Sequence, residues 1–137
     1  MKQSVILLIE DNAQNRYLTT FLLEQRGYRV VAAAVGQSGI ETAKSLQPDL
    51  ILLDIQLPKM DGYSAARSLR EDRSLSNTPI IAVTSYAMVG DREKCLAAGM
   101  DSYLAKPIRF DQLKLEIARL AAEPAMAVQY PDAVPSR

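Results

Sequence analysis

Reactive polar side chains stand at or just after the ends of short apolar runs in this chain. They are Glu10, Asp11, Asp54, Thr84 and Lys106. Three carboxylates held close together repel one another unless a cation lies among them, and a hard oxygen site of this kind suits Mg²⁺. A carboxylate can also accept a phosphoryl group when the charge on the three phosphoryl oxygens is neutralised. These residue types therefore predict magnesium-dependent phosphoryl transfer to a carboxylate, provided that folding brings them together.

Five apolar runs supply the strands that would position these groups. They span residues 5–9, 28–32, 50–53, 80–83 and 102–105, and most are continuous, as expected for parallel strands buried on both faces. Between and after the runs, apolar residues recur at helical spacing, for example Leu18, Phe21 and Leu22, and later Phe110, Leu113, Ile117 and Leu120. Repeated strand-helix units predict an α/β fold, a doubly wound parallel sheet of five strands in the order 2-1-3-4-5 with five helices.

Turn and capping residues indicate where several elements begin or end. Gly27 and Gly99 stand where a helix terminus needs the left-handed conformation. Ser38 and Glu41 have the spacing of a capping box, which predicts a helix start at Ser38. The Asp61-Gly62 pair predicts a turn before the next helix.

The carboxyl edge of the predicted sheet is where the reactive groups would meet, because ligands of open parallel sheets bind outside the carboxyl ends of the strands. Two carboxylates, a backbone carbonyl and waters can complete an octahedron around Mg²⁺ and leave one position for a phosphoryl oxygen. Gln56, two residues beyond Asp54, is placed to offer that carbonyl. The metal, Lys106 and Thr84 would then cover the three phosphoryl oxygens.

Length and composition exclude several other classes of function. The chain has 137 residues, enough for one well-buried core, so we expect one domain over residues 1–122 and a flexible, proline-containing tail over 123–137. Sixteen basic and sixteen acidic residues balance, so no net field attracts nucleic acid or an anionic membrane. The chain contains no histidine, which excludes a phosphohistidine relay within it and removes the commonest zinc ligand.

The cellular compartment is predicted from two features. The single cysteine, Cys95, excludes an intramolecular disulfide and is expected to be a packed helix residue. The apolar run at residues 5–9 is too short for a signal-peptide core or a membrane span, so the cytoplasm is the expected location.

Four segments together resemble the motif set of response-regulator receiver domains of the CheY-like type. They are Glu10-Asp11, the stretch from Asp54 to Gly62, Thr84-Ser85 and Lys106-Pro107, and the resemblance covers about residues 4 to 121. It implies that Asp54 accepts a phosphoryl group from a histidine kinase or a histidine phosphotransfer protein. Glu10 and Asp11 would help to hold Mg²⁺, with Mn²⁺ as the alternative ion, Lys106 would pair with the phosphoryl oxygens, and Thr84 would hydrogen-bond the group.

The resemblance also implies a conformational switch. Tyr103 matches an aromatic residue that turns inward when the threonine is drawn toward the phosphoryl group, and the bistable elements would be Thr84, Tyr103 and the loop from Ser85 to Gly90. The Lys106-Pro107 bond matches one that the family holds in the cis form. Gln56 and Tyr86 occupy variable positions beside the route of an attacking water and are expected to tune the lifetime of the phosphorylated state.

Partner surfaces follow from the same resemblance. The phosphoryl donor would dock against the first helix and the loop after the last strand, at Ala13, Asn15, Arg16, Pro107 and Ile108. The output surface would comprise the helix near residues 91–98, the last strand and the last helix, where homodimerisation on phosphorylation is a hypothesis. The downstream target is not predicted.

Several alternatives stay open. A haloacid-dehalogenase-like phosphatase would need a second aspartate two residues after the nucleophile, where this chain has Gln56. A pseudo-receiver that only binds proteins usually lacks one of the key residues, and none is missing here. Flavin binding is disfavoured because no phosphate-cradling loop follows the first run. A stand-alone regulator is favoured over a transcription factor because no basic or helix-turn-helix segment remains, while a receiver cut from a hybrid kinase would look the same.

Overall fold

The computed structural model describes residues 4–57, 60–85 and 90–121. Its elements are, in order, β1 (Val5–Ile9), α1 (Ala13–Gln25), β2 (Arg29–Ala33), α2 (Gly36–Leu46), β3 (Leu50–Asp54), α3 (Gly62–Glu71), a 3₁₀ turn η1 (Arg73–Leu75), β4 (Ile80–Thr84), α4 (Asp91–Ala97), β5 (Ser102–Ala105) and α5 (Phe110–Ala121). The predictions made for Tyr86, for most of the loop from Ser85 to Gly90 and for the tail at 123–137 lie outside the described residues.

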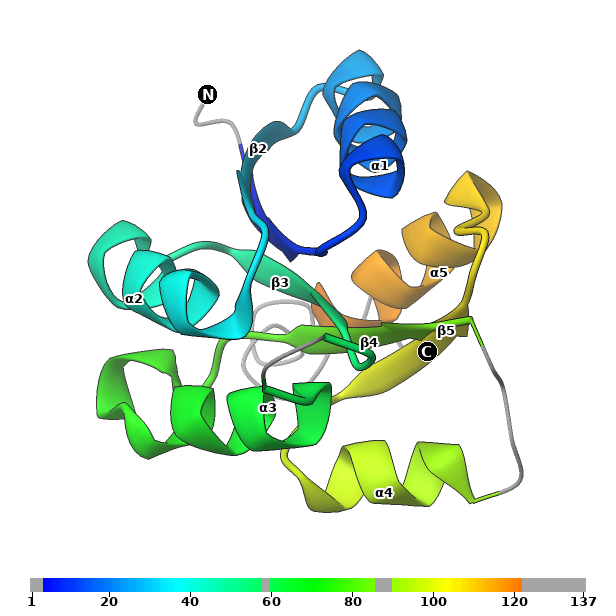
Figure 1. Ribbon diagram of the computed structural model, residues 1–137. Coiled ribbons are helices and arrows are strands. Elements are labelled where there is room, and N and C mark those ends of the chain that lie inside the picture. Colours follow the sequence, from blue (N-terminus) through cyan, green and yellow to red (C-terminus); the bar gives the residue numbers. More distant parts are fainter. Residues whose placement is uncertain (1–3, 58–59, 86–89, 122–137) are drawn as a thin grey trace, which may run out of the picture.

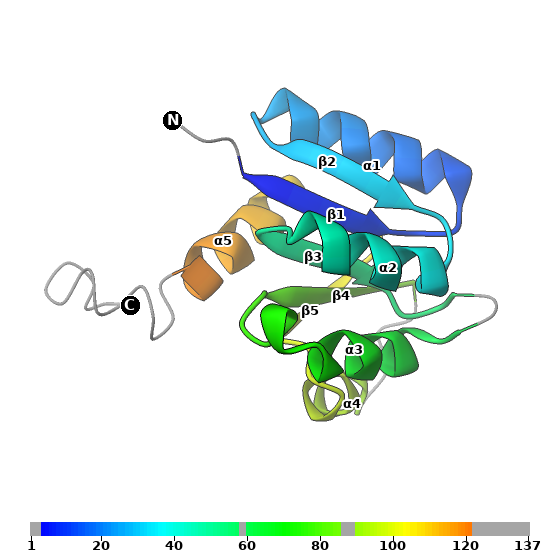
Figure 2. The same cartoon turned by 90° about the vertical axis from the view of Figure 1, so that its left-hand side faces the viewer.

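The five strands form one parallel sheet in the order β2-β1-β3-β4-β5, which confirms the predicted fold. All neighbouring strands pair in parallel, as the arrows of β1 and β2 in Figure 2 illustrate, so the carboxyl ends of the five strands share one edge. Ile9 pairs with Leu53, and Asp54 with Val83, so the ends of β1, β3 and β4 lie side by side. This register brings together residues that are far apart in the sequence.

Helices cover both faces of the sheet, with α1 and α5 on one face and α2, α3 and α4 on the other (Figure 1). Alternate strand residues serve the two layers, so Leu7 and Ile51 pack under the α2-α3-α4 layer while Leu8 and Leu52 pack under α1 and α5. All of these side chains are buried. Burial on both faces explains why the strand sequences are continuous apolar runs. Cys95 is buried on α4, as expected.

The start of α2 differs from the prediction. The helix begins at Gly36 with Val35 as its N-cap, so Ser38 lies inside the first turn rather than at the cap. Its hydroxyl donates to the Val35 carbonyl, and Glu41 accepts from the Gln37 side chain. The capping-box prediction was therefore wrong, because the first helical turn closes on the carbonyl of Val35, which also accepts from the Gly39 amide.

Other residues that were predicted to form turns and helix ends do so. Gly27 and Gly99 have φ values of +93° and +103°, the left-handed region that glycine enters without a side-chain penalty. Asp61 caps α3 and its side chain accepts from the Ser64 amide at 2.8 Å. This cap fixes where the polypeptide turns after β3 and enters the helix.

Helix α1 is present, but its apolar residues do not all face the core. Leu23 is fully buried, whereas Leu18 and Phe21 are more than half exposed, as is Tyr17. The rings of Tyr17 and Phe21 stack with centroids 6.5 Å apart. Helical spacing thus predicted the helix correctly, while the direction in which Leu18 and Phe21 point indicates a surface role rather than core packing.

Arg70, near the end of α3, joins the segments that enter β4 and β5 at the amino edge of the sheet. Its guanidinium donates to the carbonyls of Leu75, Thr78 and Gly99 and to the carboxylate of Asp101, all at 2.7–2.8 Å. One guanidinium thereby satisfies several backbone acceptors at once.

None of the helices in the described ranges has the length and apolar character needed to cross a membrane.

Candidate functional site

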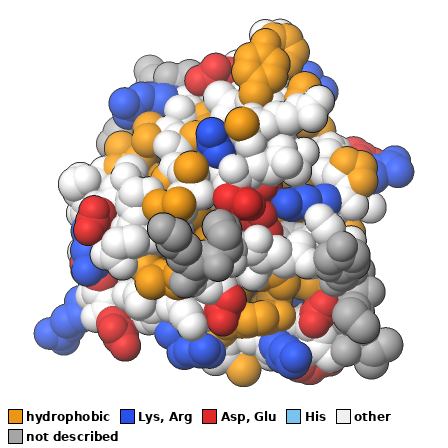
Figure 3. Space-filling model, viewed as in Figure 1, with side chains coloured by type: hydrophobic (Ala, Val, Ile, Leu, Met, Phe, Trp, Pro, Cys, Tyr) orange, Lys and Arg blue, Asp and Glu red, His pale blue; other side chains and the backbone are white. Residues whose placement is uncertain are grey.

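Three carboxylates meet at the carboxyl edge of the sheet, where the sequence predicted them. Glu10 follows β1, Asp11 comes next, and Asp54 is the last residue of β3. One oxygen of each lies within 4.8 Å of the others. Glu10 and Asp54 are 4% and 2% exposed, while Asp11 is exposed. Figure 3 shows acidic side chains together in the middle of this face.

The Lys106 ammonium lies between two of these carboxylates. Its Nζ is 3.0 Å from Glu10 Oε1 and 3.1 Å from Asp54 Oδ2, and only 15% of the side chain is exposed. Burial alone would lower the pKa of Lys106, but the hydrogen bonds to Glu10 and Asp54 outweigh it, so the pKa is raised. Lys106 is therefore a fixed positive charge within reach of any group bound to Asp54.

The pKa of Glu10 is raised, mainly because the carboxyl is buried, and the nearby charge of Asp54 raises it further. Hydrogen bonds from Lys106 and from the Asn12 amide oppose this rise. Its second oxygen, Oε2, accepts from the Asn12 amide at 3.1 Å. The Arg16 side chain holds the same turn by donating to the carbonyls of Glu10 and Asp11. The loop between β1 and α1 is thus held by hydrogen bonds from side chains to its backbone.

The donor set suits a hard divalent cation. Glu10, Asp11 and Asp54 offer carboxylate oxygens close together, and two of them are buried. Such a group of negative charges favours Mg²⁺ or Mn²⁺, which prefer oxygen ligands. Asp11 is the exposed member, so the site is open to solvent on one side.

Thr84 is placed beside the carboxylates by strand pairing. It is the last residue of β4, is 1% exposed and stands opposite Ala105 of β5. Its carbonyl accepts from the Lys106 amide at 2.7 Å, which continues the β4-β5 ladder into the lysine. The Lys106-Pro107 peptide bond is cis, as the family resemblance implied.

Gln56 makes two contacts that the sequence did not reveal. Its backbone amide donates to Asp54 Oδ1 at 2.8 Å, and its side-chain Oε1 accepts from the Ser85 amide at 3.0 Å. The first contact orients the Asp54 carboxylate. The second joins the loop after β3 to the residue after Thr84. Sequence reasoning assigned to Gln56 a backbone carbonyl for the metal and an effect on the lifetime of the phosphorylated state, and it placed Ser85 at the start of the switching loop, but it predicted no contact between the two residues.

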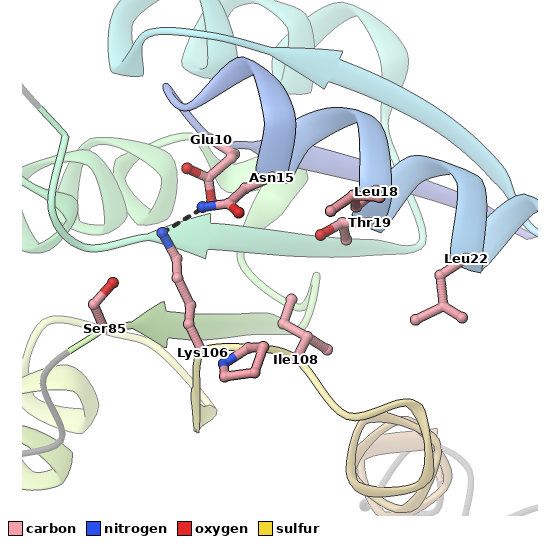
Figure 4. Close-up of a pocket in the computed structure, with 9 residues that line it drawn as sticks. Glu10, Asn15, Leu18, Thr19, Leu22, Ser85, Lys106 and Ile108 are labelled. Carbon is pink, nitrogen blue, oxygen red and sulfur yellow. Dashed lines mark ion pairs between the residues drawn. The ribbon is translucent and has the colours of Figure 1, made fainter.

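A hollow of about 500 Å³ leads to this site between α1 and the loop after β5. Figure 4 shows Lys106 and Glu10 at one end of it and Leu18, Leu22 and Ile108 along its walls. Of the predicted docking residues, Asn15, Pro107 and Ile108 line the hollow, whereas Ala13 and Arg16 do not. Leu18, Thr19 and Leu22 line it too. Helical spacing from Asn15, by three, four and seven residues, could have identified them.

The ring of Tyr103 on β5 packs against the core on the α2-α3-α4 side. Its hydroxyl is buried and has no hydrogen-bond partner among the described residues. Burial raises the pKa of Tyr103, and the charge of Asp91 adds to the effect. The ring therefore packs inward in this structure, in a position that gives its hydroxyl no partner within the described ranges.

Comparisons with known proteins agree with this geometry. Residues 6–118 match the response regulator receiver domain family. The polar-differentiation response regulator DivK of Brucella ovis is 39% identical over 103 residues, which cover 75% of this chain and 84% of DivK. The receiver domain of the sensor histidine kinase PA1611 of Pseudomonas aeruginosa PAO1, whose crystal structure has a magnesium ion coordinated in the active site cleft, is 41% identical with a TM-score of 0.81. That match covers 89% of this chain and 100% of the other.

A further structure shares the fold at lower identity. The chemotaxis protein CheY4 of Vibrio cholerae superimposes with a TM-score of 0.82 at 24% identity, over 87% of this chain and 99% of the other.

The chain belongs to the response regulator receiver domain family, which acts as a signalling switch in two-component systems. Receiver domains of response regulators interact with histidine kinases or phosphotransfer proteins, and that class of partner applies to this chain.

Proposed function

We propose that Asp54 is the phosphoryl acceptor and that its phosphorylation switches a protein-interaction surface. The observation that carries the proposal is the position of the Lys106 ammonium, 3.1 Å from Asp54 and 3.0 Å from Glu10 at the carboxyl edge of the sheet. A buried lysine held there is available to neutralise charge on phosphoryl oxygens. The 2.8 Å hydrogen bond from the Gln56 amide leaves the other Asp54 oxygen facing Lys106.

The transfer balances without any further reactant. An oxygen of the Asp54 carboxylate supplies the electron pair for the new bond to phosphorus, and the bond between phosphorus and the donor's histidine nitrogen breaks. That nitrogen keeps the electron pair of the broken bond and takes up a proton from water. Glu10, Asp11, Asp54 and the Gln56 carbonyl would hold Mg²⁺, which when bound neutralises part of the phosphoryl charge.

The donor is a histidine kinase or a histidine phosphotransfer protein that docks over the hollow between α1 and the loop after β5. The hollow is lined by apolar side chains and ends at Lys106, so a phosphohistidine presented by a helical partner would reach Asp54 from that side. Asn15, Pro107 and Ile108 would contact the donor directly. Ala13 is exposed at the start of α1 and would lie at the margin of the contact.

Thr84 and Tyr103 would transmit the change to the output surface formed by α4, β5 and α5. Phosphorylation would favour one of two existing conformations rather than create a new one. We also propose that two copies of the chain pair through that surface on phosphorylation. The proposed location is the cytoplasm. A receiver domain within a hybrid histidine kinase is the second candidate, because the 41% identical receiver domain belongs to a sensor histidine kinase.

The test is intact mass spectrometry of the wild type and of Asp54→Asn after incubation with acetyl phosphate, with and without Mg²⁺. We expect the wild type alone to gain one phosphoryl group, and only with the metal. If the wild type gains nothing under any condition, the chain is a pseudo-receiver that works by protein binding alone.

A further inference from the structure

The Gln56 side chain spans the gap between the loop after β3 and the end of β4. Its amide oxygen accepts from the Ser85 backbone N–H at 3.0 Å, across 29 residues of sequence. Gln56 is an exposed residue, so solvent could satisfy both groups if they separated. The contact is therefore formed at the surface, by a residue whose own backbone amide donates to the carboxylate that we propose as the phosphoryl acceptor.

Ser85 lies beside the site that we propose for the phosphoryl group on Asp54. It directly follows Thr84, and it lines the same hollow as Glu10 and Lys106. A phosphoryl group has three terminal oxygens, and backbone N–H groups are effective partners for them because they are fixed dipoles that carry no counter-charge. The Ser85 N–H is such a donor, but Gln56 occupies it in this structure.

We propose that the Gln56 side chain is a latch that holds the Ser85 N–H in the unphosphorylated protein and must release it before a phosphoryl oxygen can bind there. The inference rests on the proposed function of Asp54 and adds a positioning role for the Gln56 side chain, separate from its backbone carbonyl. When Asp54 is phosphorylated, the Ser85 N–H then exchanges its hydrogen bond to Gln56 for one to a phosphoryl oxygen.

The chemistry of glutamine suits this role. Its amide oxygen is a neutral acceptor, so the latch binds the N–H without adding another negative charge to the three carboxylates nearby. The exchange costs about one net hydrogen bond, which corresponds to a change in affinity of about threefold to tenfold. The latch therefore adjusts the stability of the phosphorylated state rather than forbidding it.

The first measurement uses metal-free protein and the amide proton shift of Ser85 in nuclear magnetic resonance spectra. Gln56→Met keeps the size of the side chain and removes the acceptor, so we expect the Ser85 proton to move upfield and to exchange faster with solvent. Gln56→Glu restores an acceptor oxygen and should restore the wild-type position. Gln37→Met, which removes another surface glutamine contact on α2, should leave Ser85 unchanged.

The second measurement is the affinity of each protein for beryllofluoride, a phosphoryl mimic, at fixed Mg²⁺. We expect Gln56→Met to bind about threefold to tenfold more tightly than the wild type, and Gln37→Met to bind equally. Equal affinity of Gln56→Met and wild type, or an unmoved Ser85 proton, overturns the latch alone. Absence of beryllofluoride binding by the wild type overturns the proposed function, and the latch with it.

Discussion

Lys106 explains how two carboxylates can be buried at the end of this sheet. Glu10 and Asp54 are almost fully buried, and an isolated buried carboxylate is strongly disfavoured. The shared ammonium compensates both, at 3.0 and 3.1 Å. The lysine is thus part of the fold's stability as well as of the proposed chemistry.

Lys106→Met is expected to lower the free energy of unfolding by about 3 kcal/mol in metal-free buffer, because it leaves two buried carboxylates without their cation. Added Mg²⁺ should restore part of the loss by supplying positive charge at the same place. Chemical denaturation with and without the metal measures both effects. Lys44→Met, at an exposed position on α2, is the control, and equal losses in the two variants would contradict the argument.

Tyr103→Phe is expected to raise the free energy of unfolding by about 1 kcal/mol, because it removes a buried hydroxyl that lacks a partner among the described residues. Thermal unfolding measures the change. Tyr17→Phe, at a ring that is 69% exposed, should have no effect. A Tyr103→Phe protein that is less stable than the wild type would show that the hydroxyl makes a stabilising bond in solution.

At the scale of elements, helix α1 carries apolar side chains on its outer surface as well as toward the core. Leu18 is 53% exposed and lines the hollow that leads to Lys106, next to Leu22. Exposed apolar groups beside a reactive site are typical of a docking surface. The stacked rings of Tyr17 and Phe21 extend this surface along the helix.

Leu18→Glu is expected to slow phosphoryl transfer from a histidine phosphotransfer protein by about tenfold, because a charge would replace apolar contact at the docking surface. Labelling by acetyl phosphate, which needs no docking, should be unchanged. Leu115→Glu is the matched control, since Leu115 is also an exposed leucine, on α5. Equal loss with both donors would place the effect on the site rather than on docking.

Helix α5 is attached to β5 through the Glu116 carboxylate. Glu116 Oε1 accepts from the Ser102 hydroxyl at 2.6 Å and from Arg119 at 2.9 and 3.1 Å. Partial burial by itself would raise the pKa of Glu116, but the hydrogen bonds from Ser102 and Arg119 outweigh it and hold the pKa below its usual value. The carboxylate form is therefore the one that the fold stabilises.

Because the folded pKa of Glu116 lies below the unfolded value, its stabilisation is present above about pH 4.3 and is lost as the pH falls through the folded pKa. Glu116→Gln should therefore reduce stability near neutral pH and show a shallower decline in acid. Urea unfolding at pH values between 3 and 7, chosen to span the titration of Glu116, measures the free energy of unfolding of each protein. Glu93→Gln, exposed on α4, should keep the wild-type slope, and an unchanged slope in Glu116→Gln would contradict the assignment.

The sequence predicted the central strands β1, β3 and β4 well because their apolar runs are buried on both faces. The edge strands β2 and β5 are only partly buried. Helix details were less predictable. Ser38 could have capped α2, but the chain closes its first turn on Val35 instead. The outward position of Phe21 depends on how α1 lies on the sheet, which spacing within the helix does not determine.

The charged residues of the candidate site could be predicted from the sequence, but the hydrogen bond between its neutral groups could not. Asp54 and Lys106 could be placed from their positions after strands, because all parallel strands end at one edge. The bond from Ser85 to Gln56 depends on the paths of two separate loops in space. No spacing rule links residues 29 positions apart in such loops.

At the scale of the whole molecule, the Arg70 side chain secures the amino edge of the sheet, opposite the site. It joins the end of α3 to the residues before β4 and β5 through Thr78, Gly99 and Asp101. Asp101 in turn accepts from the Ile80 amide at 2.9 Å. A side chain at Gly99 would meet Arg70 at 2.7 Å, so the glycine is required for this packing as well as for its φ value.

Arg70→Lys is expected to lower the free energy of unfolding by about 2 kcal/mol, because an ammonium cannot reach the separate carbonyls that the guanidinium satisfies. Arg67→Lys, exposed on the same helix, should be neutral. Thermal unfolding distinguishes them. Labelling of both variants by acetyl phosphate, well below the unfolding temperature, should match the wild type, since Arg70 lies at the edge away from Asp54.

Helix α3 links the residue after Asp54 to the amino edge of the sheet, because the Gly62 amide donates to the Ile55 carbonyl at 3.1 Å. Arg70 fixes its last turn, while its first residue, Gly62, follows the loop that leaves Asp54. A displacement of Ile55 would therefore be passed to the first turn of α3, while Arg70 would hold the last turn in place. The far turn would act as the pivot, and the movement would be greatest beside the carboxylates and smallest at the amino edge.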